Sequence, residues 1–452
     1  MTRWFAKNVA AERLLLLEWD GATLAALSRL ADDGTMPNMA HLFRHSARRK
    51  LRWAGVGSST AAWTTLRSGC GPAEHGVWDD SYLDHRRGWV RPVDPAAIAT
   101  PMLPGLLRAR DGGAVSQWIS DSAAAARIWA RKLTDRDTLE GGIRQTKKLL
   151  DELTAEVRRI ATATPWRLFE VRVHTVAALQ HRVWRLLGVD AEMDGASTWT
   201  ATSRQAFVAL DHMLGDLAEL ADRQNAALAL VSPYGFVRAR EKITLAELFR
   251  RRGLFETAGG IVAAEHRLRR RIWRSVRPLV SRKDGPAATG VHYPIRALLP
   301  ADWRRSRAVA LHGDHAALVY LNTPGRFGTR VLATAGARRQ ALADTIAAIG
   351  EARHPVSGEP LFSEVIGTAD TYGCDPLERS WPDVVGVPAP GFQTRHKPDH
   401  KRQLLRPDPS LAGTQGGDGF LLLCGRGIQP EENPDAELTD VAPLLMQLLP
   451  GE

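Results

Sequence analysis

The sequence predicts an α/β protein in which a mostly parallel central sheet is flanked by helices. Apolar runs of strand length alternate along the chain with longer segments whose apolar residues recur at helical spacing. This alternation favours parallel neighbours, because a parallel connection needs a crossover of about a dozen residues or more, usually a helix. The 452 residues are enough for one large unit of this kind with insertions.

The first unit places an acidic residue at the end of a strand. An apolar strand is predicted at 13–19 and a helix at 23–30, so Asp20 follows the strand directly. Ligands and catalytic groups gather at the carboxyl ends of strands in open α/β sheets, so Asp20 is a candidate functional residue. The pattern recurs as a strand at 167–174 with a helix to 187, a helix at 204–220 with a strand at 226–232, and a strand at 419–424.

Two stretches in the first half of the chain depart from this alternation. Residues 84–110 are rich in proline and arginine, and residues 143–160 predict a helix with one apolar face. We interpret them as parts of an insertion at about 84–165 within a core of residues 1–242.

The alternation lapses a second time over residues 243–355, where we predict an inserted lid or cap containing a strand at 317–322. The chain is then expected to return to the core over residues 356–452. Within that return, residues 393–410 are polar and interrupted by prolines, so we predict a loop there.

One segment of the predicted cap is strongly basic. Residues 266–283 predict a helix in which Leu268, Ile272, Val276 and Leu279 recur at helical spacing among seven arginines. We expect the helix to dock through these four apolar side chains, with its arginines in solvent. The alternative is a binding surface for nucleic acid or an anionic membrane, formed by Arg267, Arg270, Arg271 and Arg274.

Composition and charge exclude several classes of protein. With 44% hydrophobic and 24% charged residues, the chain has a globular composition, and no apolar stretch approaches the ~20 residues of a membrane span. A net charge of +10 is modest for this length. Three widely spaced cysteines and an N-terminal segment without a signal-peptide pattern lead us to expect a cytoplasmic protein without a disulfide framework.

Hydroxyl residues gather in the most informative window, GSSTAAWTTLRSGCGPAEHGVWD at 57–79. This string, LEWDGAT at 17–23, DGTMPNMAHLFRHS at 33–46 and FEVRVHTVAALQHRVWR at 169–185 occur in an order that is similar to a known family. SPYG at 232–235 and GTQGGDG at 413–419 continue the series. The chain thereby resembles the type I phosphodiesterase and nucleotide pyrophosphatase family of the alkaline phosphatase superfamily.

The resemblance implies an alkaline-phosphatase-like fold with inserted lid segments and a two-zinc hydrolase site. In such a site a zinc-bound hydroxyl attacks a phosphoester and forms a covalent intermediate. The family's nucleophile falls on Ser59, or on Thr60 in an alternative register. Asp20 and His181 match two of the family's zinc ligands, which belong to different metals in the family layout.

The other expected zinc ligands are replaced in this chain. A zinc ion needs roughly four donors, mostly Asp and His here. We therefore expect no zinc pair and no other cofactor, unless new ligands rescue a zinc site. The lost positions are occupied by Ala177, Pro233, Tyr234 and Gln415, and the candidate new ligands are His75, His174, His312, His315, His396, Asp399 and His400.

Two functions remain open at this stage. The first is a binding or regulatory protein that keeps an anion pocket, with a phosphate- or sulfate-bearing ligand or a protein as its candidate partner. Its pocket would lie where a helix starts at Ser59, because free backbone amides and the helix dipole attract anions there. The second is an active hydrolase or transferase of phosphoesters or sulfoesters, using Ser59 with a single-metal or metal-free site.

Overall fold

The structure is a computed structural model that describes most of the chain. Its described residues are 11–53, 58–86, 88–93, 98, 100–111, 116–130, 135–187, 198–280, 293–311, 315–377, 379–396, 398, 401–408, 411–432 and 434–449.

The main sheet is seven-stranded in this part of the chain, with the order β17-β2-β16-β7-β1-β6-β5. Neighbouring strands are parallel except where β16 pairs with β2 and β7. The predicted α/β fold with a mostly parallel central sheet is confirmed. The strands are β1 (Arg13–Trp19), β2 (Ala47–Arg52), β5 (Ser116–Ser120), β6 (Leu168–Val173), β7 (Ala226–Arg238), β16 (Gly413–Cys424) and β17 (Ala436–Glu437).

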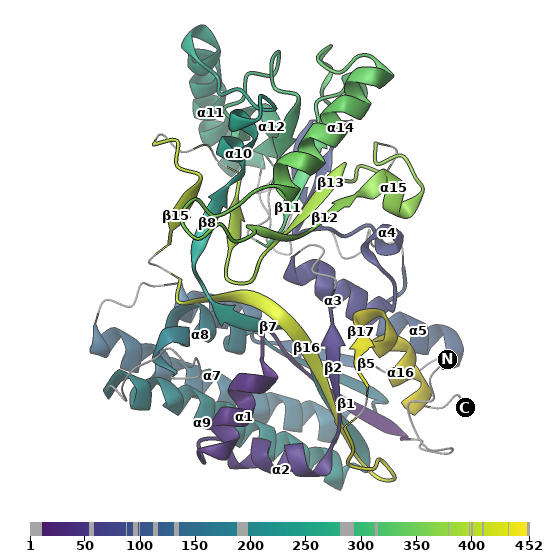
Figure 1. The fold of residues 1–452 in the computed structure, drawn as a ribbon. Coiled ribbons are helices and arrows are strands. Elements are labelled where there is room, and N and C mark those ends of the chain that lie inside the picture. Colours follow the sequence, from purple (N-terminus) through teal and green to yellow (C-terminus); the bar gives the residue numbers. More distant parts are fainter. Residues whose placement is uncertain are drawn as a thin grey trace.

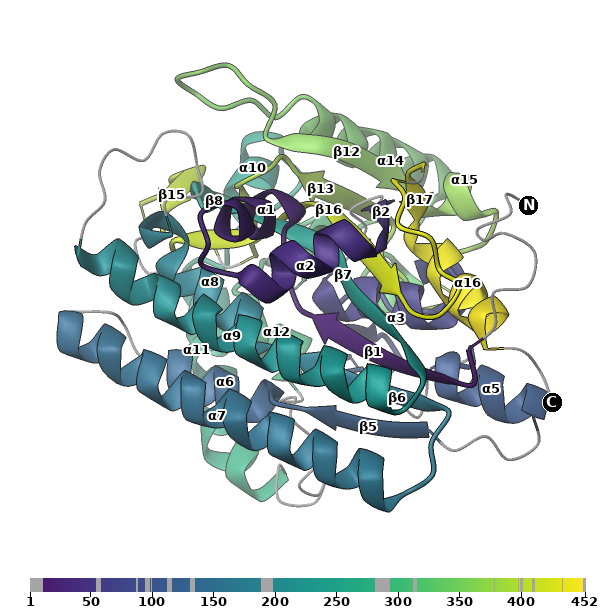
Figure 2. The same ribbon diagram turned by 90° about the horizontal axis from the view of Figure 1, so that it is seen from below.

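Helices cover both faces of this sheet, which explains the unbroken apolar run of β1. Leu15, Leu17 and Trp19 face one helix layer, whereas Leu14 and Leu16 face the other, as the alternation of a strand requires. Figure 2 shows α7 and α9 side by side across the first face. That layer contains α1 (Leu24–Asp32), α2 (Pro37–His45), α6 (Ser122–Trp129), α7 (Arg136–Ala163), α8 (Thr175–Val183), α9 (Thr198–Arg223) and the short helix η2 (Trp184–Leu186); the opposite layer contains α3 (Ser59–Ser68), α5 (Leu103–Asp111), η3 (Leu438–Asp440) and α16 (Val441–Leu448).

A second, antiparallel sheet with the order β10-β11-β13-β12 has its own hydrophobic core. We call this sheet and its helices, residues 245–388, the cap; it lies above the main sheet in Figure 1. Its strands are β10 (Ala308–Ala310), β11 (Ala317–Leu321), β12 (Phe362–Gly367) and β13 (Val384–Pro388), and its helices are α10 (Leu245–Arg251), α11 (Gly260–Val280), α12 (Ile295–Leu298), α13 (Pro324–Phe327), α14 (Ala335–Gly350) and α15 (Thr368–Tyr372).

Two small sheets complete the described strands. In the first, β8 (Glu241–Thr244) lies between β14 (Gln393–Arg395) and β15 (Leu405–Pro407). In the second, β4 (Trp89–Pro92) lies between β3 (Ser81–Asp84) and β9 (Tyr293–Pro294), and the short helix α4 (Pro72–His75) precedes it.

Several segments differ from the sequence-based expectation because their partners are distant in the chain. The loop prediction for residues 393–410 is wrong at β14 and β15, which pair with β8. The second sheet extends past residue 355, since β12 and β13 belong to it. Strand β5 lies inside the stretch 84–165 and forms the edge of the main sheet. Short strands of this kind carry little local signal.

Helix α11 confirms the predicted basic helix up to Val280, and residues 281–283 lie outside the described residues. The expectation that it docks through its apolar row is wrong at Leu268 and Ile272, because both side chains are exposed. The side chains of Val276 and Leu279 lie outside the described part of the chain, and among the described side chains of α11 that of Trp273 is buried. None of the helices in the described ranges is both long enough and apolar enough to span a bilayer.

Candidate functional site

The candidate site lies at the carboxyl ends of three neighbouring strands. Because β6, β1 and β7 are adjacent and parallel, their ends bring together His174, Asp20 and Tyr234. Gly21 follows Asp20 with a φ of 72°, a left-handed conformation that lets the chain turn away from the sheet. The fourth component is the start of α3 at Ser59.

Asp20 is the centre of the site and is 3% exposed. One carboxylate oxygen, Oδ2, lies 2.5 Å from Nδ1 of His174. The other, Oδ1, accepts hydrogen bonds from Nε1 of Trp63 at 3.0 Å and from the hydroxyl of Tyr234. The buried carboxylate therefore has three protein donors, which compensate for the loss of water around it.

The Tyr234 hydroxyl connects Asp20 with the start of α3. Tyr234 is fully buried and donates its proton to Asp20. Its oxygen accepts a 3.2 Å hydrogen bond from Nε2 of Gln415. The Ser59 side chain is near enough to counteract part of the rise in the pKa of this hydroxyl. A phenol oxygen has one proton and two lone pairs, and the contacts with Asp20 and Gln415 use the proton and one of these lone pairs.

The protonation states follow from this network. Burial by itself raises the pKa of Asp20, but the hydrogen bonds and the charge of its neighbours outweigh burial and lower this pKa to about 2. Burial lowers the pKa of His174, but the hydrogen bond and charge of Asp20 reverse the direction and raise it. Burial and the Asp20 charge raise the pKa of Tyr234 well above its ordinary value. At neutral pH Asp20 is ionised and Tyr234 is a neutral donor.

The N-terminus of α3 has hydroxyls on two different sides. Thr60 and Ser58 donate to Oδ1 of Asp80, at 2.5 and 3.0 Å, whereas Ser59 is directed to Tyr234. The N-cap residue Ser58 makes no side-chain hydrogen bond to the backbone of the first turn. The geometry therefore joins Ser59, and not Thr60, to the Asp20 network.

A group of buried charged residues packs around Trp63, next to the site. Arg172 lies over the Trp63 ring at 4.3 Å and pairs with Glu18 at 2.8 Å. Arg67 pairs with Glu170 at 2.6 Å, and both glutamates are fully buried in neighbouring strands. These contacts fix the indole that donates to Asp20. Sequence patterns give no signal for them beyond the unusual glutamates within apolar strands.

His181 lies on α8 and is turned toward the chain backbone. Its Nδ1 lies 2.9 Å from the carbonyl oxygen of Gly413, and burial lowers the pKa of its imidazole to about 4. No hydrogen bond or ion pair joins His181 to Asp20 in the described structure, although the charge of Asp20 counteracts part of the fall in the His181 pKa.

Three of the four residues that we expect at replaced family ligand positions have contacts near the site. Ala177 lies beside Gly21, since a Cβ atom added to Gly21 would be 3.4 Å from the Cβ of Ala177. Pro233 precedes Tyr234 in β7, and Gln415 pairs with β7 just before a β-bulge. These side chains supply no carboxylate or imidazole.

The proposed substitute ligands are distributed over several environments. His75 has Nε2 3.0 Å from the Thr65 hydroxyl and accepts a backbone hydrogen bond from Val77 at Nδ1, so both ring nitrogens are used. His315 is near enough to His181 to influence its pKa. His312, Asp399 and His400 lie outside the described residues. Within the described ranges, His396 included, no three His, Cys, Asp or Glu side chains form a group that could hold a metal ion.

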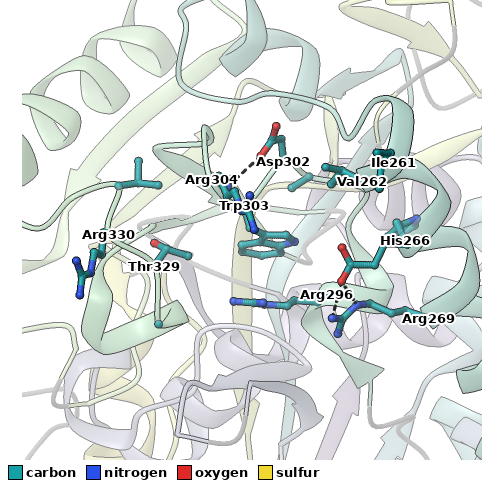
Figure 3. A pocket seen from close by; sticks show the side chains of 14 residues that line it. Ile261, Val262, His266, Arg269, Arg296, Asp302, Trp303, Arg304, Thr329 and Arg330 are labelled. Atoms are coloured by element: carbon teal, nitrogen blue, oxygen red, sulfur yellow. Dashed lines mark hydrogen bonds and ion pairs between the residues drawn. The ribbon is translucent and has the colours of Figure 1, made fainter.

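A large cavity lies elsewhere, in the cap. It has a volume of about 810 Å³ and is bounded by α11, α12 and the segments at 301–304 and 328–331. Figure 3 shows Trp303 beside Arg296 on its wall, with Arg269, Arg304 and Arg330 around them. This cavity contains none of the residues that contact Asp20.

Comparison with known proteins places the whole chain. Phosphonoacetate hydrolase from Sinorhizobium meliloti is similar in structure, with a TM-score of 0.58, 13% identity and coverage of 97% of this chain and 95% of the other. Human ectonucleotide pyrophosphatase/phosphodiesterase 5 gives a TM-score of 0.51, 13% identity and coverage of 97% and 96%. An inactive form of the murine protein in complex with AMP gives 0.52, 14%, 98% and 97%.

These identities establish similarity of fold alone, and no curated protein matches the sequence. The family model described as type I phosphodiesterase/nucleotide pyrophosphatase matches residues 14–418, which is most of the chain. The resemblance found in the sequence is thereby confirmed, and the chain belongs to the type I phosphodiesterase/nucleotide pyrophosphatase family.

Proposed function

We propose that this protein binds a small phosphate- or sulfate-bearing ligand beside Ser59, and that it acts as a binding or regulatory member of its family without a two-zinc centre. The observation that carries the proposal is the Tyr234 hydroxyl, which lies between Asp20 and Ser59. Tyr234 donates a hydrogen bond to Asp20, which matches a family ligand position, and it lies near Ser59, which matches the family's nucleophile position.

The residues present do not fit a zinc pair. Each zinc ion needs several anionic or imidazole donors to replace its hydration shell. Asp20 already accepts hydrogen bonds from three side chains, so a cation at this carboxylate must displace them. Tyr234 offers a phenol whose raised pKa opposes the ionisation that metal binding requires. Ala177 and Pro233 offer no side-chain donor.

Three features favour an anion at this edge of the sheet. The ten-residue helix α3 begins here, and the backbone N–H groups of a first turn attract anions. His174 has a raised pKa and a side chain that is 34% exposed, so it can present positive charge to a ligand. Phosphonoacetate and AMP, the molecules bound in two of the similar structures, both carry a phosphonate or phosphate group.

The alternative is an enzyme that uses Ser59 without the zinc pair. It is favoured by the continuous set of contacts from Ser59 through Tyr234 and Asp20 to His174. A nucleophilic serine needs a base with a pKa near the working pH. Asp20 has a pKa of about 2 and the Tyr234 phenol is neutral, so neither accepts the proton of Ser59 readily. This electrostatic argument favours binding over catalysis.

The first test combines metal analysis with a phosphate titration. We expect less than one zinc, manganese or calcium ion per chain after expression with these metals, and calorimetric binding of inorganic phosphate that persists in EDTA. Ser59→Asp should abolish phosphate binding, because it adds a negative charge at the start of α3. Thr60→Ala is the matched control, since the Thr60 hydroxyl is directed to Asp80. About two tightly held metal ions per chain would overturn the proposal.

A second test separates binding from catalysis. Hydrolysis of an aryl phosphodiester or aryl sulfate that is lost in Ser59→Ala and kept in Thr60→Ala would establish the enzymatic alternative. We expect no such Ser59-dependent activity. Replacing Tyr234→His together with Gln415→His should increase zinc retention, because it returns two imidazoles to the family's ligand positions.

We also propose a reducing compartment as the location. The support is that Cys70, Cys374 and Cys424 are all free thiols.

A further inference from the structure

The outer face of α11 exposes three large aliphatic side chains. Ile261, Leu268 and Ile272 are 88%, 58% and 55% exposed. Their spacings of seven and four residues place them in one row along the helix. We call these three residues the apolar stripe. The helix contacts the rest of the protein through a different side, where Trp273 packs edge-on against Trp89 of β4 with ring centroids 5.1 Å apart.

Exposed arginines lie beside the apolar stripe. Arg267 and Arg271 flank the row, whereas Arg270 lies on the far side of the helix from it, because residues two apart do not share a face. All three are exposed and form no ion pair or hydrogen bond with any other described residue. Arg269 pairs with Glu265 at 2.6 Å, and Glu265 is the single acidic residue of the helix sequence. The side chain of Arg274, the remaining arginine predicted for this surface, lies outside the described part of the chain. The helix thus presents an excess of positive charge without internal partners.

The cavity behind the helix extends this positive surface. Ile261 belongs both to the apolar stripe and to the cavity wall, so the two features adjoin at the start of α11. Arg304 and Arg330 on the wall have no ion-pair partner among the described residues. Arg296 lies over the Trp303 ring at 6.0 Å and donates to the carbonyl oxygen of Phe327 at 3.0 Å (Figure 3).

This combination distinguishes between two anionic partners. A nucleic acid would satisfy the arginines, but its phosphate backbone offers no apolar phase for three exposed aliphatic side chains. A bilayer surface that contains anionic phospholipids offers both a negative potential and the edge of the acyl region. We propose that the outer face of α11 binds anionic phospholipid membranes, with the apolar stripe entering the interface and the arginines contacting lipid phosphates.

The position of α11 is compatible with such contact. Figure 1 shows the helix at the end of the cap that is remote from the main sheet. The helix would lie on the bilayer and not cross it. This inference is independent of the ligand site beside Ser59, because no residue of α11 contacts the Asp20 network in the described structure.

The experiment is co-sedimentation of the full chain with vesicles of phosphatidylcholine alone and with phosphatidylcholine containing phosphatidylglycerol. We expect binding only to the anionic vesicles, and weaker binding as salt increases. Arg267→Gln with Arg271→Gln should weaken binding by roughly fivefold per charge. The matched control is Arg338→Gln with Arg339→Gln, which removes two exposed charges from α14.

The apolar stripe is tested by Leu268→Ser with Ile272→Ser, for which we expect at least a tenfold loss of vesicle binding. Val356→Ser removes an 89% exposed aliphatic side chain elsewhere in the cap and should change nothing. Circular dichroism verifies that each variant is folded. The proposal would be overturned if the double serine variant bound anionic vesicles as tightly as the native chain. It would also be overturned if the native chain did not bind anionic vesicles. Salt-sensitive binding of duplex DNA without vesicle binding would overturn it in favour of nucleic acid.

Discussion

The Asp20 site and the outer face of α11 differ in how their charged groups are placed. At Asp20 a buried carboxylate is paired with donors from Trp63, Tyr234 and His174. On α11 several arginines and the apolar stripe face solvent without partners among the described residues. The buried carboxylate has its hydrogen-bond donors inside the protein, whereas the exposed groups of α11 would find partners only in another molecule.

This difference indicates which property of each region carries information about function. A buried charge is tolerated only with hydrogen-bond partners, so the partners of Asp20 show how this carboxylate is stabilised inside the protein. Exposed charges and aliphatic groups contribute little to folding, so their concentration on one helix calls for an external explanation. Substitutions at the Asp20 site should therefore lower the free energy of unfolding much more than substitutions in the apolar stripe.

The largest expected effect is at Asp20. Asp20→Ala removes the acceptor of three buried donors, and we expect a loss of about 3–5 kcal/mol in the free energy of unfolding. Denaturation in urea measures this loss. Asp32→Ala, at an exposed position of α1, should change the stability by less than about 0.5 kcal/mol. Equal effects of the two variants would contradict the central role of the buried carboxylate.

The next largest effect is expected at Trp273, in contrast to its neighbour Ile272 on α11. Trp273→Ala deletes the buried anchor of the helix and should cost about 3 kcal/mol, whereas Ile272→Ser should change the stability by less than about 0.5 kcal/mol. Thermal and urea unfolding of the two variants provide the comparison. A large loss in Ile272→Ser would mean that the apolar stripe supports the fold and is not available to a membrane.

Part of this arrangement could be predicted from the sequence. The strand before Asp20 was predictable because it is buried on both faces, which requires the continuous run Leu14 to Leu17. The contact between Asp20 and Tyr234 was not, since these residues are 214 positions apart and meet only through the pairing of β1 with β7. The resemblance placed Tyr234 at an expected ligand position and gave no indication that its hydroxyl would bind the carboxylate.

The basic helix shows a different limit of sequence patterns. Leu268 and Ile272 were correctly assigned to one row of a helix, but apolar spacing does not say which row contacts the protein. That choice depends on Trp89, which belongs to a strand far away in the chain and receives Trp273. The cap strands β12 and β13 were missed for a related reason, because antiparallel pairing is decided by distant partners.

A third prediction concerns pH and the interior near α3. Burial lowers the pKa of His75 to about 4, and the side chain is 3% exposed. The unfolded chain therefore binds more protons between this value and the ordinary histidine pKa of about 6.5, so stability decreases as the pH falls through that window. We expect His75 to contribute a loss of about 2 kcal/mol between pH 7 and pH 5.

Urea unfolding of His75→Asn at the two pH values measures this contribution. The variant should have a smaller dependence of stability on pH than the native chain. His45→Asn, which changes an exposed histidine on α2, should keep the native dependence. An unchanged pH dependence in His75→Asn would show that the buried ring is not the group that titrates.

The smallest effect, and the sharpest for the ligand site, concerns Asp80. This exposed carboxylate accepts the hydroxyls of Ser58 and Thr60 beside the start of α3, where it opposes an incoming anion. Asp80→Asn keeps an oxygen acceptor and removes one negative charge, so phosphate affinity should increase about fivefold, or about 1 kcal/mol at a solvent-exposed position. Calorimetric titration with phosphate measures it. Asp151→Asn makes the same charge change on the surface of α7 and should have no effect. If the two variants bind phosphate equally well, the anion does not lie at the start of α3, because only Asp80 is close enough to repel it there.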